Sequence, residues 1–432
     1  MPTLTADSAG KTARSLHVLG VMSGLTAGAW LGTAEAPTKF VTAGLSPFLI
    51  SLAMVAGVFV ARWTVPTALK GTQYIWLDLR EKPHLIAWAV IAGALWAVAN
   101  TLTVFAIRDV GLSIAFPLWN TNSLIGLLWG CLLFRELRGA GLGGWSKVAG
   151  GAVAILLGAI LLAYAASAHH AASAPHRATA GIIAAISAGL LWGTMYIPYK
   201  KAYLSGMNPL SFVTVFTIGE LITMTTLALV FMGGPGPLLD AIALAKPVLF
   251  WLFLGGFFWV LGDLFQQFAA KYIGISRGIP LSNTNQLWGL AWGVLVFGEL
   301  AGQGNMTRLL VICGSLIMIL GAVAISSAVA SSAEQSSWRE AAMSECKRYG
   351  LDFKRVAATQ AGEDPLAAEA TGFRWWDGAI LAAAVGVFVV LAFWAERPPI
   401  AMERGWTAVL VTATMTLLVV CGRMLWKRTR FS

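Results

Sequence analysis

Long apolar segments, separated by short polar stretches, run along most of this chain. Each is about 20 residues long, enough for a helix to cross a hydrocarbon layer of ~30 Å. A transmembrane β-barrel would show shorter segments of alternating polarity. The pattern therefore predicts an all-α polytopic membrane protein with helices at Leu16–Ala34, Pro47–Val65, Leu85–Ile107, Leu112–Phe134, Val148–Ala168, Gly181–Tyr203, Pro209–Met232, Val248–Ala270, Ile275–Phe297, Leu309–Val329, Gly378–Ala395 and Thr407–Trp426.

Two stretches of the chain carry nearly the same sequence. Trp96–Leu137 and Trp259–Leu300 align without a gap, and Gly32 and Gly193, each followed by threonine, align at almost the same offset. The first ten helices therefore form two repeats of five. Because five is odd, the second repeat enters the membrane upside down relative to the first. We expect a ten-helix inverted-topology repeat (5+5) plus two extra C-terminal transmembrane helices.

The same pattern divides the chain into five parts. In the linker that precedes the last two helices, Ser337 and Glu340 form a capping-box pattern, and apolar residues recur at helical spacing. We expect an amphipathic helix there, lying on the membrane or on the rest of the protein. The predicted parts are a cytoplasmic N-terminus (1–15), the first repeat (16–168), the second repeat (181–329), a cytoplasmic linker (330–377) and a two-helix C-terminal extension (378–426).

Composition agrees with a membrane protein. Of 432 residues, 57% are apolar and 12% are charged, and the mean hydropathy is +0.73; a soluble domain has about 25% charged residues. The net charge of +10 does not indicate nucleic-acid binding, because the basic residues, among them Arg62, Lys70 and Arg80, fall in short loops predicted to face inward. We expect a multi-pass protein of the plasma (inner) membrane with both termini cytoplasmic, its first helix a retained span and not a signal peptide.

Several polar residues fall at membrane depth, where a charged side chain costs at least ~2.5–3.5 kcal/mol. Asp263 lies midway along the eighth predicted helix with Gln266 one turn on, and Glu220 lies mid-way along the seventh. A carboxyl buried there can take up and release a proton, so Asp263 and Glu220 are candidates for proton coupling. Asn100 occupies the position of Asp263 in the other repeat, and Asn100 and Gln266 are candidates for substrate binding. The alternative is a structural hydrogen bond between helices, worth ~1 kcal/mol.

Both repeats carry the element Pro-x-x-Asn-Thr-Asn within a predicted helix. Proline removes one backbone hydrogen bond, and irregular backbone at this depth is tolerated where it lines a cavity or packs in protein. Carboxamides both donate and accept hydrogen bonds, as hydroxylated solutes do. The residues concerned are Asn120, Asn122, Asn283 and Asn285. Members of a pair differ by about 200° around a helix, so we expect one of each to face a shared cavity. Helix kinking and interhelix hydrogen bonds remain the alternative.

Tryptophan is abundant, with 19 residues, and Trp96 and Trp259 occupy equivalent repeat positions. Their rings can pack on the apolar face of a pyranose, which makes both candidates for substrate binding. Packing or a place in the aromatic belts at the membrane surface is the alternative. The cysteines and histidines lack metal-binding or redox spacing, so neither a metal nor a cofactor is expected.

The segment Trp259–Leu300, with Gly-Ile-Ser-Arg-Gly-Ile-Pro-Leu-Ser-Asn-Thr-Asn-Gln-Leu at its centre, resembles the drug/metabolite transporter superfamily. Within it, the chain is most similar to the bacterial glucose/ribose porter group, which is related to rhamnose–proton symporters. The resemblance covers about Leu16–Val329 and implies a ten-helix porter that takes up a monosaccharide with a proton. Two features depart from that group: Asn283–Asn285 stands where Ser-Thr-Gly is more usual, and the C-terminal helices are additional.

These observations predict a secondary transporter (porter) for a small hydroxylated solute, a monosaccharide taken up with protons by alternating access. An exporter, or a porter of another small metabolite or amphipathic drug, is the alternative. A membrane enzyme acting on lipid-linked sugar is more remote, because the loops lack a carboxylate–histidine or metal cluster. The expected partners are the solute, protons and the lipid bilayer, with a homodimer left open and no nucleic acid.

Overall fold

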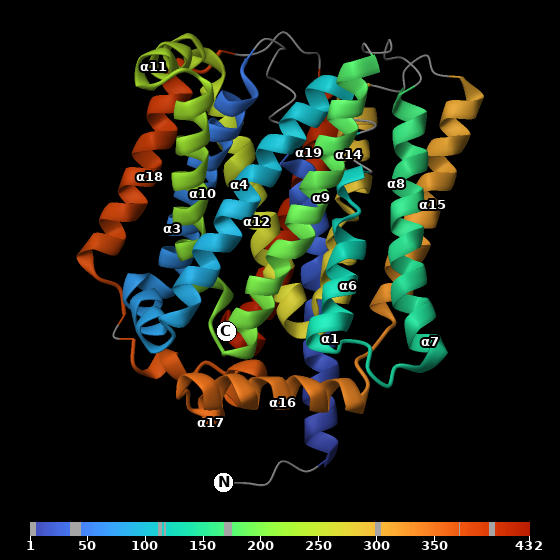
Figure 1. Cartoon of the computed structure of the whole chain (residues 1–432), viewed down its shortest axis with the longest axis vertical. Helices are drawn as coiled ribbons and strands as arrows, with labels where there is room; N and C mark the ends of the chain where they lie inside the picture. The colour runs from blue at the N-terminus through green and yellow to red at the C-terminus, as the bar shows by residue number, and fades with distance from the viewer. Residues whose placement is uncertain are drawn as a thin grey trace.

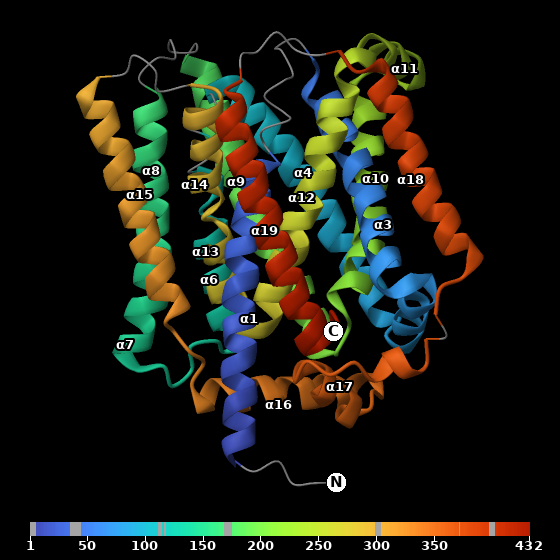
Figure 2. The ribbon, with the colours of Figure 1, turned by 180° about the vertical axis from the view of Figure 1, so that it is seen from behind.

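The computed structural model describes residues 6–34, 45–110, 115, 118–167, 175–298, 304–370, 372–396 and 402–432. Over these ranges the chain is helical, without β-strands. Most helices run side by side between two ends of the molecule, as Figures 1 and 2 show from opposite sides. Both the start of α1 and the end of α19 lie toward the lower end in Figure 1.

The long helices are α1 (Ala6–Thr33), α3 (Pro47–Glu81), α4 (His84–Val110), α8 (Gly151–Ser167), α9 (Pro175–Leu204), α10 (Pro209–Phe231), α12 (Lys246–Ile273), α15 (Asn305–Ser326), α18 (Trp375–Trp394) and α19 (Arg404–Thr429). Shorter elements are α6 (Asn122–Phe134), α7 (Gly141–Trp145), α11 (Pro235–Leu244), α13 (Ile275–Ser282), α14 (Asn285–Ala291), α16 (Ser332–Tyr349), α17 (Phe353–Gln360), the π-helices η1 (Ser146–Gly150) and η2 (Trp292–Val296), and the 3₁₀ helix η3 (Pro365–Ala368).

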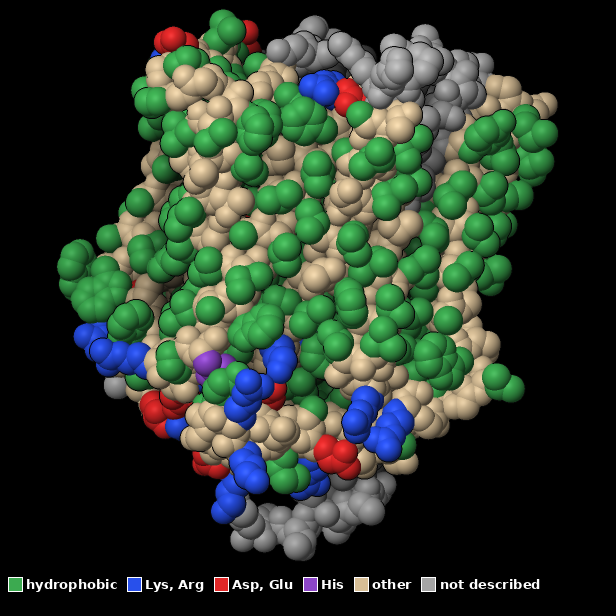
Figure 3. Space-filling view, in the orientation of Figure 1, with side chains coloured by type: hydrophobic (Ala, Val, Ile, Leu, Met, Phe, Trp, Pro, Cys, Tyr) green, Lys and Arg blue, Asp and Glu red, His purple; other side chains and the backbone are tan. Residues whose placement is uncertain are grey.

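Nine helices in the described ranges are long and apolar enough to cross a membrane. Hydrophobic side chains cover the flank of the molecule, and Lys and Arg gather mainly at the end where α16 lies (Figure 3). A soluble protein rarely exposes so large an apolar surface. The chain is therefore a polytopic α-helical membrane protein, as its hydrophobic pattern predicts.

The structure corrects the prediction around the second helix. The expected end is Val65, with Arg62, Lys70 and Arg80 counted among loop residues, but the first helical stretch of α3 runs on to a kink at Gly71 and a second stretch reaches Glu81. Gly71, whose φ of 75° is not helical, separates the two stretches and turns the chain between them. Such a φ suits glycine, which has no Cβ. All three basic residues consequently belong to α3, and Arg62 is buried.

The ninth predicted helix, Ile275–Phe297, is divided into α13, α14 and η2. Helix α13 contains Pro280 and ends at Ser282, and a turn at Asn283 and Thr284 precedes α14. The sequence expectation of irregular backbone beside this proline is therefore confirmed. In the other repeat, Pro117 lies outside the described residues, and α6 begins at Asn122.

Glycine lets four helices touch backbone to backbone near the centre of the bundle. A Cβ added at Gly57 of α3 or Gly256 of α12 would lie 2.0 Å from a carbonyl oxygen of the facing helix. The corresponding distance is 2.0 Å for Gly93 of α4 and 2.2 Å for Gly219 of α10. Small residues permit such close crossings between membrane helices. These contacts hold α3 against α12 and α4 against α10.

Substituting Gly93→Ala should therefore destabilise the bundle. The new methyl group would overlap the Phe216 carbonyl of α10, and overpacking of this kind costs about 1–3 kcal/mol. We expect a lower thermal midpoint and a smaller monodisperse peak by fluorescence-detected size exclusion. Gly150→Ala is the matched control, because a Cβ there meets nothing within 4 Å. Equal thermal midpoints for the two variants would contradict the proposed role of the close crossing.

The two C-terminal helices pack on different parts of the bundle. Helix α18 lies along α3 and α12, with the Phe388 ring 5.1 Å from that of Phe253 and 5.0 Å from that of Phe257. Helix α19 lies along α1 and η2, where Cys421 Sγ is 3.6 Å from Ser23 Oγ. Each helix extends the bundle at its rim.

The linker folds against the bundle. Helices α16 and α17 lie across its lower end in Figures 1 and 2. The sequence predicts that this helix is capped by Ser337, but α16 begins earlier and is capped by Ser331. The Ser331 hydroxyl accepts from the Glu334 N–H at 3.1 Å, and Ser337 lies inside the helix. The Glu334 carboxylate also binds both terminal nitrogens of Arg277, at 2.7 and 2.8 Å. That buried pair fixes the helix start at Ser331.

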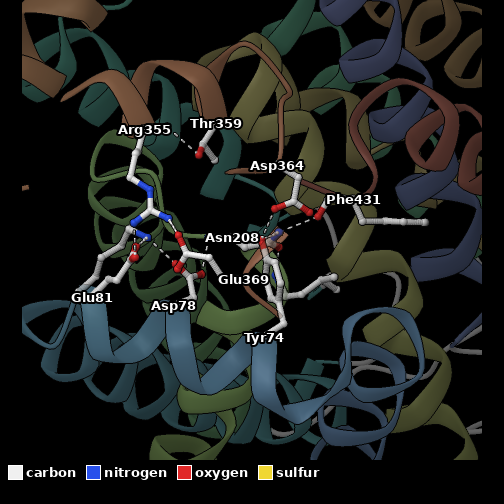
Figure 4. Close-up of polar contacts among 11 residues, drawn as sticks. Tyr74, Asp78, Glu81, Asn208, Arg355, Thr359, Asp364, Glu369 and Phe431 are labelled. Carbon is white, nitrogen blue, oxygen red and sulfur yellow. Dashed lines mark hydrogen bonds and ion pairs between the residues drawn. The ribbon is translucent and has the colours of Figure 1, made fainter. Parts of the chain in front are cut away.

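A second set of polar contacts holds the rest of the linker and the end of α19 at the same place (Figure 4). Arg355 binds Glu81 of α3 at 2.7 Å. The Tyr74 hydroxyl donates to Asp364 at 3.0 Å, and the Asn208 amide donates to the Phe431 carbonyl at 2.7 Å. The linker, α3 and the chain segment after α19 thus meet at one end of the bundle.

Candidate functional site

Three ionisable side chains meet inside the bundle, each from a different helix. The Arg62 guanidinium of α3 lies between two carboxyls: its Nη2 donates to Asp263 Oδ2 of α12 at 2.6 Å, and its Nη1 lies 3.0 Å from Glu220 Oε2 of α10. All three side chains are buried. We call this group the Arg62 triad. It brings together both acids that the sequence singled out, and the arginine that links them was not anticipated.

Aromatic rings enclose the arginine of the triad. The Arg62 guanidinium carbon is 4.2 Å from the Phe216 ring centroid and 5.5 Å from that of Trp259, within the range of cation–π attraction. Trp259 in turn contacts Trp96 edge to face, with centroids 4.8 Å apart. The two repeat-related tryptophans therefore lie together beside the triad.

Charge balance limits what the triad can hold. One guanidinium neutralises one carboxylate, so two ionised carboxyls would leave a buried net charge of −1. Burying an uncompensated charge costs several kcal/mol, so the arrangement favours one proton on the pair. Asp263 also accepts from Gln267 Nε2 at 3.3 Å, whereas Glu220 Oε1 has no partner at hydrogen-bonding geometry within the described structure. Glu220 is therefore the better place for that proton.

Hydrogen bonds extend from the triad along α12. Gln267 donates to Asp263 and accepts from the Tyr203 hydroxyl of α9. Gln266, the sequence candidate, points elsewhere: its amide donates to Ser282 Oγ of α13 at 2.5 Å. Neighbouring residues on a helix are about 100° apart, which explains why only one of the two glutamines reaches the acid.

Asn100 does not join the triad. Its amide donates to Ser51 Oγ of α3 at 3.3 Å. Ser51 and Arg62 are 11 positions apart on that helix, a rise of about 16 Å. The equivalent positions in the two repeats, Asn100 and Asp263, therefore contact different levels of α3.

The asparagines of the repeated element form a cluster between the two repeats. Asn283 Nδ2 donates to Asn122 Oδ1 at 2.9 Å, to Ser123 Oγ at 2.7 Å and to the Asn120 carbonyl at 3.4 Å. Two buried polar atoms remain without a partner in the described structure, Nδ2 of Asn120 and Oδ1 of Asn285. Asn120, Asn122 and Asn283 thus lie together and bind one another, with Asn283 contacting the side chain of Asn122 and the backbone of Asn120. That one residue of each pair faces a shared cavity stays a prediction.

No cluster suited to a metal ion is found in the part of the chain that the structure describes, where no three His, Cys, Asp or Glu side chains converge. Two other repeated tryptophans have structural roles: Trp129 donates to Thr194 Oγ1 at 3.3 Å, and Trp292 donates to Thr33 Oγ1 at 3.1 Å. Each bond ties an interior helix to a helix of the other predicted repeat. The triad and the asparagine cluster remain as candidate sites.

The chain is similar to known sugar transport proteins. A family model described as "Sugar transport protein" matches residues 182–349. A "Putative sugar uptake protein" of Streptococcus pyogenes serotype M6 is 25% identical over 263 residues, which cover 58% of this chain and 82% of that protein. One from Listeria innocua serovar 6a is 24% identical over 242 residues, covering 54% of this chain and 76% of that protein.

One solved structure, titled "Crystal structure of protein", covers 71% of this chain and 95% of its own at 17% identity and a TM-score of 0.45, too low to support a conclusion. The wider drug/metabolite transporter superfamily and the relation to rhamnose–proton symporters stay predictions. The family model and the distant relatives support a sugar transporter family, and their descriptions point to a transporter rather than an enzyme.

Proposed function

We propose that this protein is a secondary transporter that takes up a monosaccharide by alternating access, coupled to protons. The observation that carries the proposal is the Arg62 triad, which places two carboxyls and one guanidinium inside a membrane-spanning bundle. Ionisable groups at this depth mark substrate and proton pathways in transporters. The similarity to sugar uptake proteins supplies the substrate class.

Contacts between helices support an inverted pair of repeats. If the sequence repeat exchanges α1 with α9, α3 with α10 and α4 with α12, the packing of α1 on α12 has its counterpart in that of α9 on α4. The packing of α3 on α12 likewise has its counterpart in that of α10 on α4. The Trp129–Thr194 and Trp292–Thr33 hydrogen bonds are exchanged in the same way. An interior site between two such repeats fits alternating access.

The triad suggests how a proton would be coupled to the conformational change. With a proton on Glu220, the charges of Arg62 and Asp263 balance and the bundle can stay closed around them. Loss of that proton leaves a net negative charge, which is less costly where the site opens to water. Proton binding would therefore shift the balance between closed and open states by its different affinity for each.

The substrate would be held by the groups near the triad and between the repeats. The Trp96 and Trp259 rings offer apolar faces for the C–H side of a pyranose. Carboxamides of Asn120, Asn122 and Asn283 can exchange their mutual hydrogen bonds for bonds to sugar hydroxyls. Binding at the asparagine cluster would then separate two segments that are joined in the present conformation.

Transport in proteoliposomes tests the function. We expect at least one monosaccharide from a radiolabelled panel to enter, and to accumulate above its outside concentration only when an inward proton gradient is imposed. Empty liposomes and a protonophore serve as controls. Uptake that only equilibrates, whatever the gradient, would reject proton coupling. A panel in which no sugar enters would reject the substrate class.

A related prediction concerns orientation. We propose that both termini and the linker face the cytoplasm, because Lys and Arg gather at that end of the bundle. Two exposed positions lie at opposite ends, Asp240 in α11 and Lys347 in α16. In a background without native cysteines, Asp240→Cys should react with an impermeant maleimide in intact cells, and Lys347→Cys only after permeabilisation. Reaction of both from the same side would contradict this arrangement.

A further inference from the structure

A cavity of about 200 Å³ lies where the linker meets the bundle. Its walls come from α1, α9, α12 and α13 of the bundle and from α16 and α17 of the linker. Helix α16 crosses the lower end of the bundle in Figures 1 and 2, where α1 runs on past it. The volume is well above that of one water molecule and below the about 300–1,000 Å³ of drug-sized pockets, so a ligand here would be small.

The lining of this cavity is basic. Lys200, Lys271 and Arg277 line it, and no carboxylate side chain does. Two of the cations form ion pairs with carboxylates outside the lining: Lys200 with Glu136 at 2.9 Å, and Arg277 with Glu334. Lys271 makes no ion pair within the described ranges. Its charge is therefore left without a direct counterion.

Buried donors without acceptors gather in the same lining. Lys271 Nζ, Arg277 Nε and the Trp338 indole Nε1 all lack a hydrogen-bond partner among the described residues. None of the lining side chains has a buried acceptor that lacks a hydrogen-bond partner. An unsatisfied buried donor is costly, so the cavity calls for a group that accepts several hydrogen bonds. Water could accept some of them, but it would bring no negative charge to Lys271.

We propose that this cavity binds a small ligand through a phosphate group. The three unsatisfied donors come from α12, α13 and α16, and the three free oxygens of a phosphomonoester could accept from all of them, whereas a carboxylate has two. Charge-assisted hydrogen bonds of this kind are short and strong. The aromatic rings of Tyr203 and Trp338, with the Gln360 amide, can pack on a small hydroxylated body attached to the phosphate. Such a ligand would bridge the bundle and the linker and stabilise the docked linker.

The site is independent of the transport proposal, because its evidence lies outside the Arg62 triad and the asparagine cluster. A phosphomonoester could reach it from two sources, a soluble metabolite or the headgroup of phosphatidic acid. The shared chemistry makes the same demand on Lys271. The two sources are distinguished by adding either a soluble phosphomonoester or a lipid to the purified protein.

Ligand binding to the full chain in neutral detergent tests the proposal. The probes are glucose 6-phosphate, inorganic phosphate, glucose and phosphatidic acid, each followed by isothermal titration and by the thermal midpoint, which a ligand of the folded state raises. We expect a phosphate-bearing probe to bind and glucose not to bind here. Lys271→Gln should weaken that binding about tenfold or more. Trp338→Phe, which keeps an aromatic ring and loses the indole donor, should weaken it severalfold.

Lys354→Gln is the matched control, an exposed lysine of α17 outside the cavity lining, and its affinity should equal that of the unmodified chain. Binding of phosphatidic acid alone would identify the headgroup as the source, and binding of glucose 6-phosphate without lipid would identify a soluble ligand; either upholds the phosphate site. The proposal is overturned if no phosphate-bearing probe binds, or if folded Lys271→Gln and Trp338→Phe both bind as tightly as the unmodified chain.

Discussion

Replacing Arg62 with leucine is expected to destabilise the folded protein by about 3–5 kcal/mol, because removing one partner leaves buried charge uncompensated. Without the guanidinium, the charge of Asp263 stays inside the bundle beside Glu220, and neither acid is paired with another cation among the residues that the structure describes. The variant should show a strongly reduced thermal midpoint and little monodisperse protein in detergent.

A compensated variant separates the loss of charge from the loss of volume. Arg62→Leu combined with Glu220→Gln and Asp263→Asn removes every charge of the triad while keeping the carboxyl shapes. A buried ionic group can often be replaced by neutral residues at little cost, so we expect this triple variant to recover much of the lost stability. If the triple variant were no more stable than Arg62→Leu alone, packing of the arginine stem, and not charge balance, would explain its burial.

The hydrophobic pattern predicts most of this fold because one physical requirement dominates it. A segment that crosses a bilayer must be apolar and must satisfy its own backbone hydrogen bonds, so length and composition reveal the long helices. The same rule does not reveal where a helix continues beyond the membrane. The helical stretch after the kink at Gly71 reaches Glu81, beyond the predicted end at Val65. Arg62 lies inside that predicted limit, although it is counted among the inward-facing basic residues of the loops.

The sequence predicts the two acids of the candidate site but not its arginine, because only the acids stand in the middle of predicted helices. Asp263 and Glu220 stand in the middle of predicted helices, where an isolated charge is conspicuous. Arg62 lies near the expected end of its helix, where an arginine is ordinary. Two buried acids need a buried cation nearby, and this requirement could have identified Arg62. It is the arginine inside the predicted limits of the second helix.

Long-range contacts explain the other differences. Ser331 and Ser337 both stand three residues before a glutamate, and sequence alone gives each a capping box. The choice is made by Arg277, which binds Glu334 at the start of α16. The contacts among the asparagines likewise depend on where α6 and α13 meet, which their spacing along the chain does not determine.

Asp263→Asn is expected to abolish accumulation of sugar driven by a proton gradient while exchange of sugar across the membrane persists. Asparagine keeps the shape of the side chain and its contact with Gln267, but it carries no charge. Among the described residues Arg62 then keeps Glu220 as its one counterion, and the pair is neutral without a proton. A cluster that is balanced in its deprotonated state gains nothing by loading a proton, so transport would be uncoupled from the gradient.

The measurement compares two assays on the same proteoliposomes. Gradient-driven accumulation should fall to the level of the protonophore control, while counterflow, in which labelled sugar exchanges with unlabelled sugar, should be largely retained. Glu220→Gln should give the same result in both assays, because the charges of Arg62 and Asp263 then balance with no titratable Glu220 beside them. Asp240→Asn, an exposed acid of α11, should leave both assays unchanged. If Asp263→Asn still concentrated sugar against its gradient, Asp263 would be a structural partner of Arg62, and Glu220 would be the remaining acid of the triad able to carry the proton.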